Sequence, residues 1–213
     1  MNHRILAVAV AVAAALTLGT GAASAQQAAP ANVTEVAGVK YDNEATVGGS
    51  RLVLNGAGVR YKAIFKVYAA GLYMPAKTDN PDVVSATNAP RRMHIVMLRD
   101  IDANELGKLF TRGMQDNATR EEFAKAIPAT IQMGELFAAR KKLASGDYFT
   151  VDWKPGEGTT ISINGKPSLG PIKEPEFFSA MMKIWFGKQP ADQALKDVLL
   201  GKSPAGSTRT RDR

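Results

Sequence analysis

One arginine and one tyrosine in an apolar segment have the side chains best suited to chemistry in this chain. Arg60 and Tyr68 lie within residues 52–75, which are otherwise rich in the aromatic and branched residues typical of a half-buried strand. They are an even number of residues apart, so in one unbroken strand both would project from the same face. A guanidinium and a phenol that converge inside an apolar sheet suit an anion with an apolar tail, or an enolate. The plainer alternative is an arginine at a solvated strand end and a tyrosine in the core.

The histidines and cysteines offer little for metal binding or nucleophilic catalysis. His94 lies between apolar neighbours in an expected strand, the other histidine is His3 near the start of the chain, and there is no cysteine. A transition-metal site needs several such ligands, and a serine-histidine-aspartate triad needs a nucleophile motif that the chain lacks. We therefore expect His94 to be structural, and we expect no metal and no cofactor.

Four charged residues near the expected helices have two interpretations each. Asp100 and Asp102 could act as a pair of acids, but at a strand-to-helix junction a capping role is favoured. Arg99 and Arg112 could line a site or serve as surface ion-pair partners.

The first residues predict export. Residues 1–25 have a basic start, a short apolar run and the small-residue pattern Ala23-Ser24-Ala25, as in a secretory signal peptide cleaved after Ala25. Residues 26–35 are expected to form a disordered leader, residues 36–201 one domain, and residues 202–213 a disordered basic tail. The expected location is the periplasm or the exterior of the cell.

The charge balance limits the partners. The formal net charge is +7, with part of it in the tail. Export would separate the chain from nucleic acid and the remaining charges are dispersed, so we expect no nucleic-acid binding and at most peripheral contact with anionic membranes. The oligomeric state stays open.

The order of the expected elements predicts an α+β fold. Strands are expected over residues 33–41, over 51–54 with continuation past the Gly56–Gly58 bulge or turn to residue 74, and over 92–98, with a short helical turn in 77–90. Hairpin strands are expected over 147–153 and 159–163, and two further helices over 174–187 and 191–200. Segregated strands and helices favour an antiparallel sheet covered on one face by helices.

Two helices between these groups of strands carry capping signals. Asp102 with Glu105 begins the first helix, and Thr119 with Glu122 begins the second as a capping box. The apolar stripe of the first contains Leu106, Leu109, Phe110 and Met114. The buried side of the second is expected to contain Phe123, Ile127, Ile131, Leu136 and Leu143.

Residues 56–60 and 65–73 resemble the chalcone isomerase superfamily, in particular its bacterial exported branch. The resemblance implies an open-faced β-sandwich, a large antiparallel sheet with a layer of helices. It also implies that Arg60 faces a ligand cleft. The superfamily's enzymes carry a threonine at the position of Tyr68, whereas its fatty-acid binders carry a tyrosine that pairs with the arginine on the carboxylate.

The same resemblance places three further residues at the ligand. Phe123 matches a tyrosine of the enzymes without its hydroxyl, Thr130 matches an asparagine, and Ile184 matches a polar threonine. These differences argue against chalcone cyclisation. The favoured hypothesis is a non-catalytic protein that binds a fatty acid or similar amphipathic carboxylate between sheet and helices. The alternatives are an isomerase of the intramolecular-lyase type, in which Arg60 would stabilise an enolate, and an envelope scaffold whose cleft is filled by its own side chains.

Overall fold

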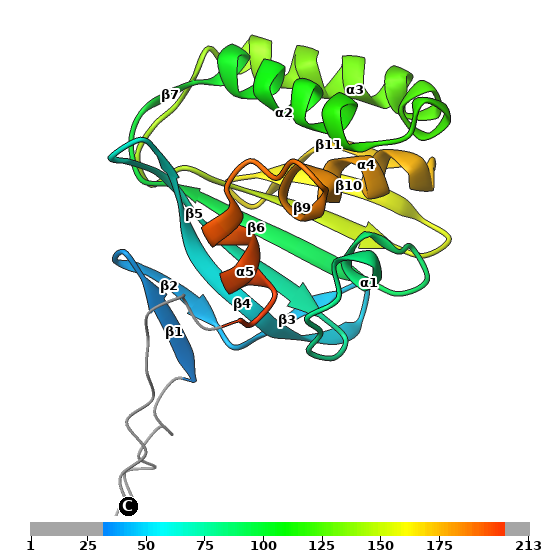
Figure 1. Cartoon of the computed structure of the whole chain (residues 1–213). Helices are drawn as coiled ribbons and strands as arrows, with labels where there is room; N and C mark the ends of the chain where they lie inside the picture. Colours follow the sequence, from blue (N-terminus) through cyan, green and yellow to red (C-terminus); the bar gives the residue numbers. More distant parts are fainter. Residues whose placement is uncertain (1–31, 203–213) are drawn as a thin grey trace, which may run out of the picture. The chain divides into compact units, whose positions relative to one another are not determined.

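The computed structural model describes residues 32–202 of the 213-residue chain. The expected signal peptide, residues 26–31 of the expected leader and residues 203–213 of the expected tail lie outside the described residues. The described part forms an α+β fold whose centre is one seven-stranded antiparallel sheet (Figure 1). The expected fold class is therefore confirmed. None of the described helices combines the length and the apolar character needed to span a membrane.

The sheet runs in the order β11-β10-β9-β6-β5-β4-β3, and each neighbouring pair is antiparallel. Its strands are β3 (Glu44–Val47), β4 (Ser50–Lys62), β5 (Phe65–Met74), β6 (Arg91–Met97), β9 (Tyr148–Lys154), β10 (Gly158–Ile163) and β11 (Lys166–Ile172). The strands expected over 92–98, 147–153 and 159–163 correspond to β6, β9 and β10. The edge strand β11 was not predicted, because its sequence KPSLGPI contains two prolines and a glycine and is typical of a loop.

The segment from Arg51 to Met74 is two strands rather than one. β4 and β5 form a hairpin that turns at Ala63 and Ile64, and Ala63 adopts a φ of 53°. The expected irregularity near Gly56 is a bulge inside β4, where the pairing shifts between Leu54 and Gly56. The prediction of one continuous strand was wrong because the turn at residues 63 and 64 lacks the glycine or asparagine that usually marks a hairpin.

A second hairpin covers part of the face of the sheet that the helices leave open. β1 (Val33–Val36) and β2 (Val39–Asp42) replace the single strand expected over 33–41, with the turn at Ala37 and Gly38. The first described strand thus begins at Val33, earlier than the domain boundary expected at residue 36. Tyr41 of β2 packs in a small core with Ala69 and Tyr73 of β5.

Helices cover the other face (Figure 1). They are α1 (Pro81–Ser85), α2 (Ala103–Asn117), α3 (Arg120–Arg140), α4 (Pro175–Phe186) and α5 (Gln193–Leu199), and a short pair, β7 (Ile101–Asp102) with β8 (Lys142–Leu143), lies at the start of α2. Asp102 caps α2 by accepting a hydrogen bond from the Glu105 amide at 2.9 Å. The capping box of Thr119 and Glu122 is present at α3, as expected.

The buried side of α3 differs from the expected one. Its buried residues are Ala126, Ala129, Thr130, Met133 and Phe137, whereas Ile127 and Ile131 are 42% and 56% exposed. Three of these five residues are small, because α4, buried nearly all round, occupies the space between α2, α3 and the sheet. The large isoleucines therefore point to solvent.

Helix α5 packs directly on β4. A side chain at Gly56 would meet the carbonyl oxygen of Val198 at 2.1 Å, and one at Gly58 would meet Leu195 at 3.1 Å. Arg60 is the next residue of β4 on this face, so the fold places its side chain just beyond α5 and under the helical layer.

Candidate functional site

Arg60 and Tyr68 are direct cross-strand partners in the β4–β5 hairpin. Partners in register project from the same face of a sheet. The Arg60 guanidinium carbon lies 5.5 Å from the centre of the Tyr68 ring, which is a cation–π distance. The sequence therefore predicted their common face correctly, although the reason is hairpin pairing and not alternation along one strand.

The two residues differ in burial. Tyr68 is fully buried, and its hydroxyl accepts a hydrogen bond from the indole Nε1 of Trp185 in α4 at 2.8 Å. Burial raises the pKa of Tyr68 to about 12, against the opposing effect of the nearby Arg60 charge. The phenol thus stays protonated at neutral pH.

Aromatic side chains fill the space behind this pair. Trp185 contacts Phe110 of α2 at 5.6 Å between ring centres, and Phe110 and Phe137 both contact Phe149 of β9. The middle of the layer between sheet and helices is therefore packed with side chains, as in an ordinary core.

A cavity of about 300 Å³ lies beside Arg60, on the side away from these packed aromatic residues. Its walls come from the β4–β5 hairpin, the residues after β6 and the first turns of α2. The apolar lining is Phe65, Val67, Ile101, Leu106 and Leu109. Leu109 belongs to the expected apolar stripe of α2 but is 42% exposed, because it faces the open side of this cavity. Nε of Arg60 is buried and has no hydrogen-bond partner among the described residues.

Positive and negative side chains share the rim of the cavity, but their surroundings differ. Asp100 binds Lys142 at 2.8 Å, and this contact lowers the pKa of its carboxyl. Glu105 binds Lys108, and Asp102 caps α2. Arg99 instead stacks on the Phe65 ring at 5.1 Å. The carboxylates are thus engaged by their own neighbours, and the arginines retain donors for an anion.

The three residues that the resemblance placed at the ligand lie elsewhere in the helical layer. The Thr130 hydroxyl donates to the Ala126 carbonyl of its own helix at 2.8 Å. Phe123 packs on the core, and Ile184 packs against Gly113 of α2. None of them lines the cavity beside Arg60. Their contact with a ligand stays a prediction, and it would require a ligand that reaches past Tyr68.

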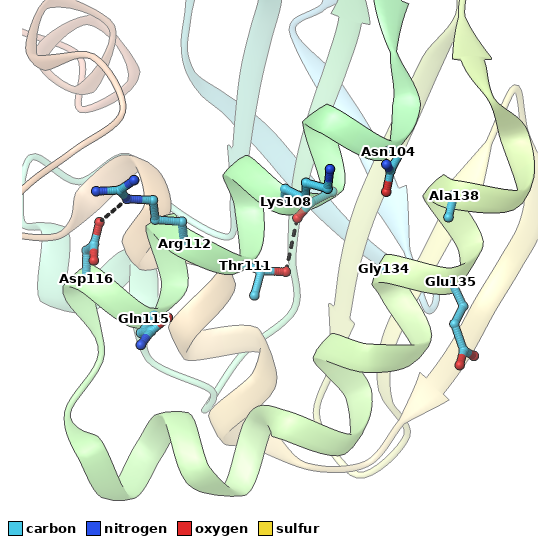
Figure 2. Close-up of a pocket in the computed structure, with 10 residues that line it drawn as sticks. Asn104, Lys108, Thr111, Arg112, Gln115, Asp116, Gly134, Glu135 and Ala138 are labelled. Atoms are coloured by element: carbon cyan, nitrogen blue, oxygen red, sulfur yellow. Dashed lines mark hydrogen bonds and ion pairs between the residues drawn. The ribbon is translucent and has the colours of Figure 1, made fainter.

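A larger hollow, of about 730 Å³, lies between α2 and α3 (Figure 2). Its lining includes Gly107 and Gly134, where the helices carry no side chain. The charged residues around it are exposed, and Arg112 pairs with Asp116 at 3.5 Å. A ligand there would gain little from charges that are already solvated and paired. Arg112 is thus a surface ion-pair partner, and the smaller cavity at Arg60 is the better candidate site.

Comparison with known proteins agrees with this architecture. A sequence model of chalcone isomerase-like proteins matches residues 33–201. The chain belongs to the chalcone isomerase-like family. No curated protein matches the chain by sequence.

A solved structure shows the same fold. The crystal structure of a fatty-acid-binding protein of Arabidopsis thaliana superposes with a TM-score of 0.58 at 13% sequence identity, over 76% of this chain and 92% of that one. The helix-covered antiparallel sheet is therefore the chalcone isomerase-like fold that the sequence predicted.

Sequence reasoning missed most of the cavity walls of this chalcone isomerase-like chain. The sequence left open whether Arg99 lines a site or forms a surface ion pair, and it placed Phe65 inside a continuous strand. A signal was present: residues 61–66 place Tyr61, Ile64 and Phe65 among lysines in a segment too polar for a buried strand.

His94 lies on the opposite face of the sheet, between the rings of Tyr41 and Tyr148 at 5.4 and 5.2 Å. Its Nε2 is buried and has no hydrogen-bond partner among the described residues. Burial, with the nearby Arg92 charge, lowers the pKa of His94 to about 4, although Asp152 and Asp42 oppose the shift. These surroundings fit the expected structural role.

Acidification is expected to destabilise the fold through His94. An unfolded histidine takes up a proton near pH 6.5 but the folded one only near pH 4. The unfolded state therefore binds more protons in this range, and about 3 kcal/mol of stability is lost as the pH falls through it. Urea unfolding of the parent and of His94→Phe at several pH values would measure this. Parallel pH profiles for the two proteins would contradict it.

Proposed function

We propose that this protein binds a fatty acid or a similar amphipathic carboxylate in the cavity beside Arg60, without chemical turnover. The observation that carries the proposal is the Arg60 side chain in the wall of a cavity with an apolar lining and a charged rim, where its buried Nε has no hydrogen-bond partner among residues 32–202. An unsatisfied buried donor is costly, and a carboxylate would satisfy it with charge-assisted hydrogen bonds. The fatty-acid-binding protein of the same fold supports this choice of ligand.

Within the proposed site, Arg60 holds the carboxylate and Tyr68 positions Arg60. The ring of Tyr68 supports the guanidinium from behind, and Trp185 fixes the Tyr68 hydroxyl. Arg99, held on the Phe65 ring, supplies a second positive charge at the rim. The apolar walls then receive the first part of the acyl tail, at about 0.8 kcal/mol for each buried methylene.

The size of the cavity limits the tail. A volume of about 300 Å³ is at the lower end of the range of ligand pockets. The packed aromatic side chains behind Tyr68 close the route toward the centre of the fold. We therefore propose a medium-chain carboxylate, or a longer chain whose end emerges from the cavity.

Replacing Arg60 with glutamine is expected to weaken binding of a medium-chain fatty acid about 10- to 100-fold, the usual effect of losing hydrogen bonds from a charged group. The melting temperature should change little, because the side chain is only partly buried. Titration calorimetry with decanoate, below its micelle concentration, would measure the affinity. Arg112→Gln is the matched control, since Arg112 is an exposed arginine at the hollow between α2 and α3 and does not line the cavity beside Arg60.

Two results would contradict the proposal. Equal affinity of Arg60→Gln and the parent would remove Arg60 from the site. Turnover of a chalcone above its spontaneous rate, lost in Arg60→Gln, would favour the alternative of an isomerase, in which the guanidinium stabilises an enolate.

Export to the periplasm or the exterior is also a proposal. It is supported by the basic, apolar and small-residue pattern of residues 1–25. The intact mass of the protein purified from the cell envelope would show whether cleavage follows Ala25.

A further inference from the structure

The tip of the β4–β5 hairpin, residues 61–66, exposes large apolar side chains. Ile64 is 84% exposed, Phe65 55% and Tyr61 46%, and together they make up three of the seven large exposed apolar residues in the described part of the chain. They occupy one tight turn at the end of two long strands. Such a cluster is uncommon on a surface that contacts only water.

Three cations around this tip have no carboxylate partner among the described residues. Lys62 and Lys66 are exposed, and neither they nor Arg99 takes part in a salt bridge within residues 32–202. The carboxylates near the tip have partners: Asp100 binds Lys142, Glu105 binds Lys108, Asp102 caps α2, and Asp192 accepts from the backbone amides of Tyr61 and Leu195. The hairpin tip therefore carries free positive charge beside its apolar residues.

We propose that residues 61–66 dock the protein on an anionic lipid bilayer, with Ile64, Phe65 and Tyr61 entering the interface. An aromatic and aliphatic tip flanked by lysines matches this environment, because apolar side chains enter the acyl boundary while cations meet anionic headgroups. Charge complementarity thus selects a negatively charged membrane surface.

The docked face also carries the mouth of the cavity. Lys62 and Phe65 belong both to the tip and to the cavity lining, next to Arg60. A bilayer at the tip would lie against the opening through which an amphipathic carboxylate enters. Docking itself needs no ligand, so it can be tested independently of the proposed function.

Vesicle flotation of the purified chain tests the apolar contribution. Partition onto vesicles of phosphatidylcholine with phosphatidylglycerol should fall about tenfold in Ile64→Ser, from the loss of one buried aliphatic side chain. Ile131→Ser is the matched control, because Ile131 is 56% exposed on α3 and should not affect partition. Equal partition of Ile64→Ser and the parent would overturn the proposal.

The charges are tested by the same assay. Lys62→Gln and Lys66→Gln should each lower partition about fivefold, the factor typical of a lysine near an anionic surface. Lys77→Gln, beyond the far end of β5, should not lower it. If the parent partitioned equally onto pure phosphatidylcholine vesicles and onto vesicles that contain phosphatidylglycerol, the proposed role of the lysines would be overturned.

Spectroscopy and ligand titration separate docking from ligand binding. In Ile64→Trp, the emission of the added indole should shift to the blue when anionic vesicles are present, and an unchanged spectrum in vesicle-bound protein would overturn insertion of the tip. In vesicle-free solution, Ile64→Ser should bind decanoate as the parent does. If the parent did not bind decanoate in vesicle-free solution, that result would count against the proposed function and not against docking.

Discussion

Replacing Trp185 with alanine is expected to lower the free energy of unfolding by about 3–5 kcal/mol and to lengthen the acyl chain that the protein accepts. Trp185 is 1% exposed, contacts Phe110 and donates to the Tyr68 hydroxyl. Its removal leaves a cavity behind the Arg60–Tyr68 pair and frees the phenol. The melting temperature should fall by about 10 °C or more for a domain of this size.

The effect on the ligand follows from the position of the new cavity. In the parent, affinity should stop rising with chain length once the cavity beside Arg60 is full. In Trp185→Ala the tail can pass Tyr68, so each further buried methylene should strengthen binding about fourfold. Dissociation constants for a series of saturated fatty acids, measured with melting curves, would show whether the two chain-length profiles differ.

The second tryptophan provides the matched control. Trp153 is 4% exposed, stacks on Phe178 and donates to the Thr87 carbonyl, and it pairs with Arg91 at the end of β6 away from Tyr68. Trp153→Ala should cost similar stability and leave the chain-length profile unchanged. If both variants showed the parent profile, the proposed path behind Arg60 would be excluded.

The features that the sequence predicted well are local. The capping box of Thr119 and Glu122 and the cap at Asp102 depend on residues three apart, and both are present. The β9–β10 hairpin is marked by glycine at its turn. The common face of Arg60 and Tyr68 was also predicted, since cross-strand pairing and alternation along a strand both preserve it.

The features that were missed depend on contacts between distant segments. Ile127 and Ile131 have the apolar character of core residues, yet the position of α4 selects the alanine side of α3 for burial. The bond from Trp185 to Tyr68 joins residues 117 positions apart, and no local pattern indicates it. The cavity is formed by β4, β5, α2 and the link between β6 and β7, so its existence was not readable from any one of them.

A methyl group added at Gly56 is expected to destabilise the protein by about 3 kcal/mol, the upper end of the cost of overpacking. The new carbon would lie 2.1 Å from the Val198 carbonyl oxygen and 2.9 Å from that of Leu199. Both are backbone atoms of the α5 end, so neither can move by a simple rotation. Helix α5 would have to separate from β4, which also strains the hydrogen bond from the Asn55 amide to the Leu199 carbonyl.

The same glycine-to-alanine substitution at Gly134 should have the opposite effect on stability. Gly134 lies inside α3, and outside its own helical backbone no atom of residues 32–202 lies within 4 Å of an added carbon, so Gly134→Ala should stabilise the protein by about 1 kcal/mol through helix propensity. Urea unfolding of both variants would measure the contrast, and equal stabilities would show that α5 adapts freely.

Because Asp192 at the start of α5 binds the Tyr61 amide beside Arg60, a displaced α5 should also weaken carboxylate binding in Gly56→Ala. The glycines of β4 would then set both the stability of the sheet–helix contact and the position of Arg60.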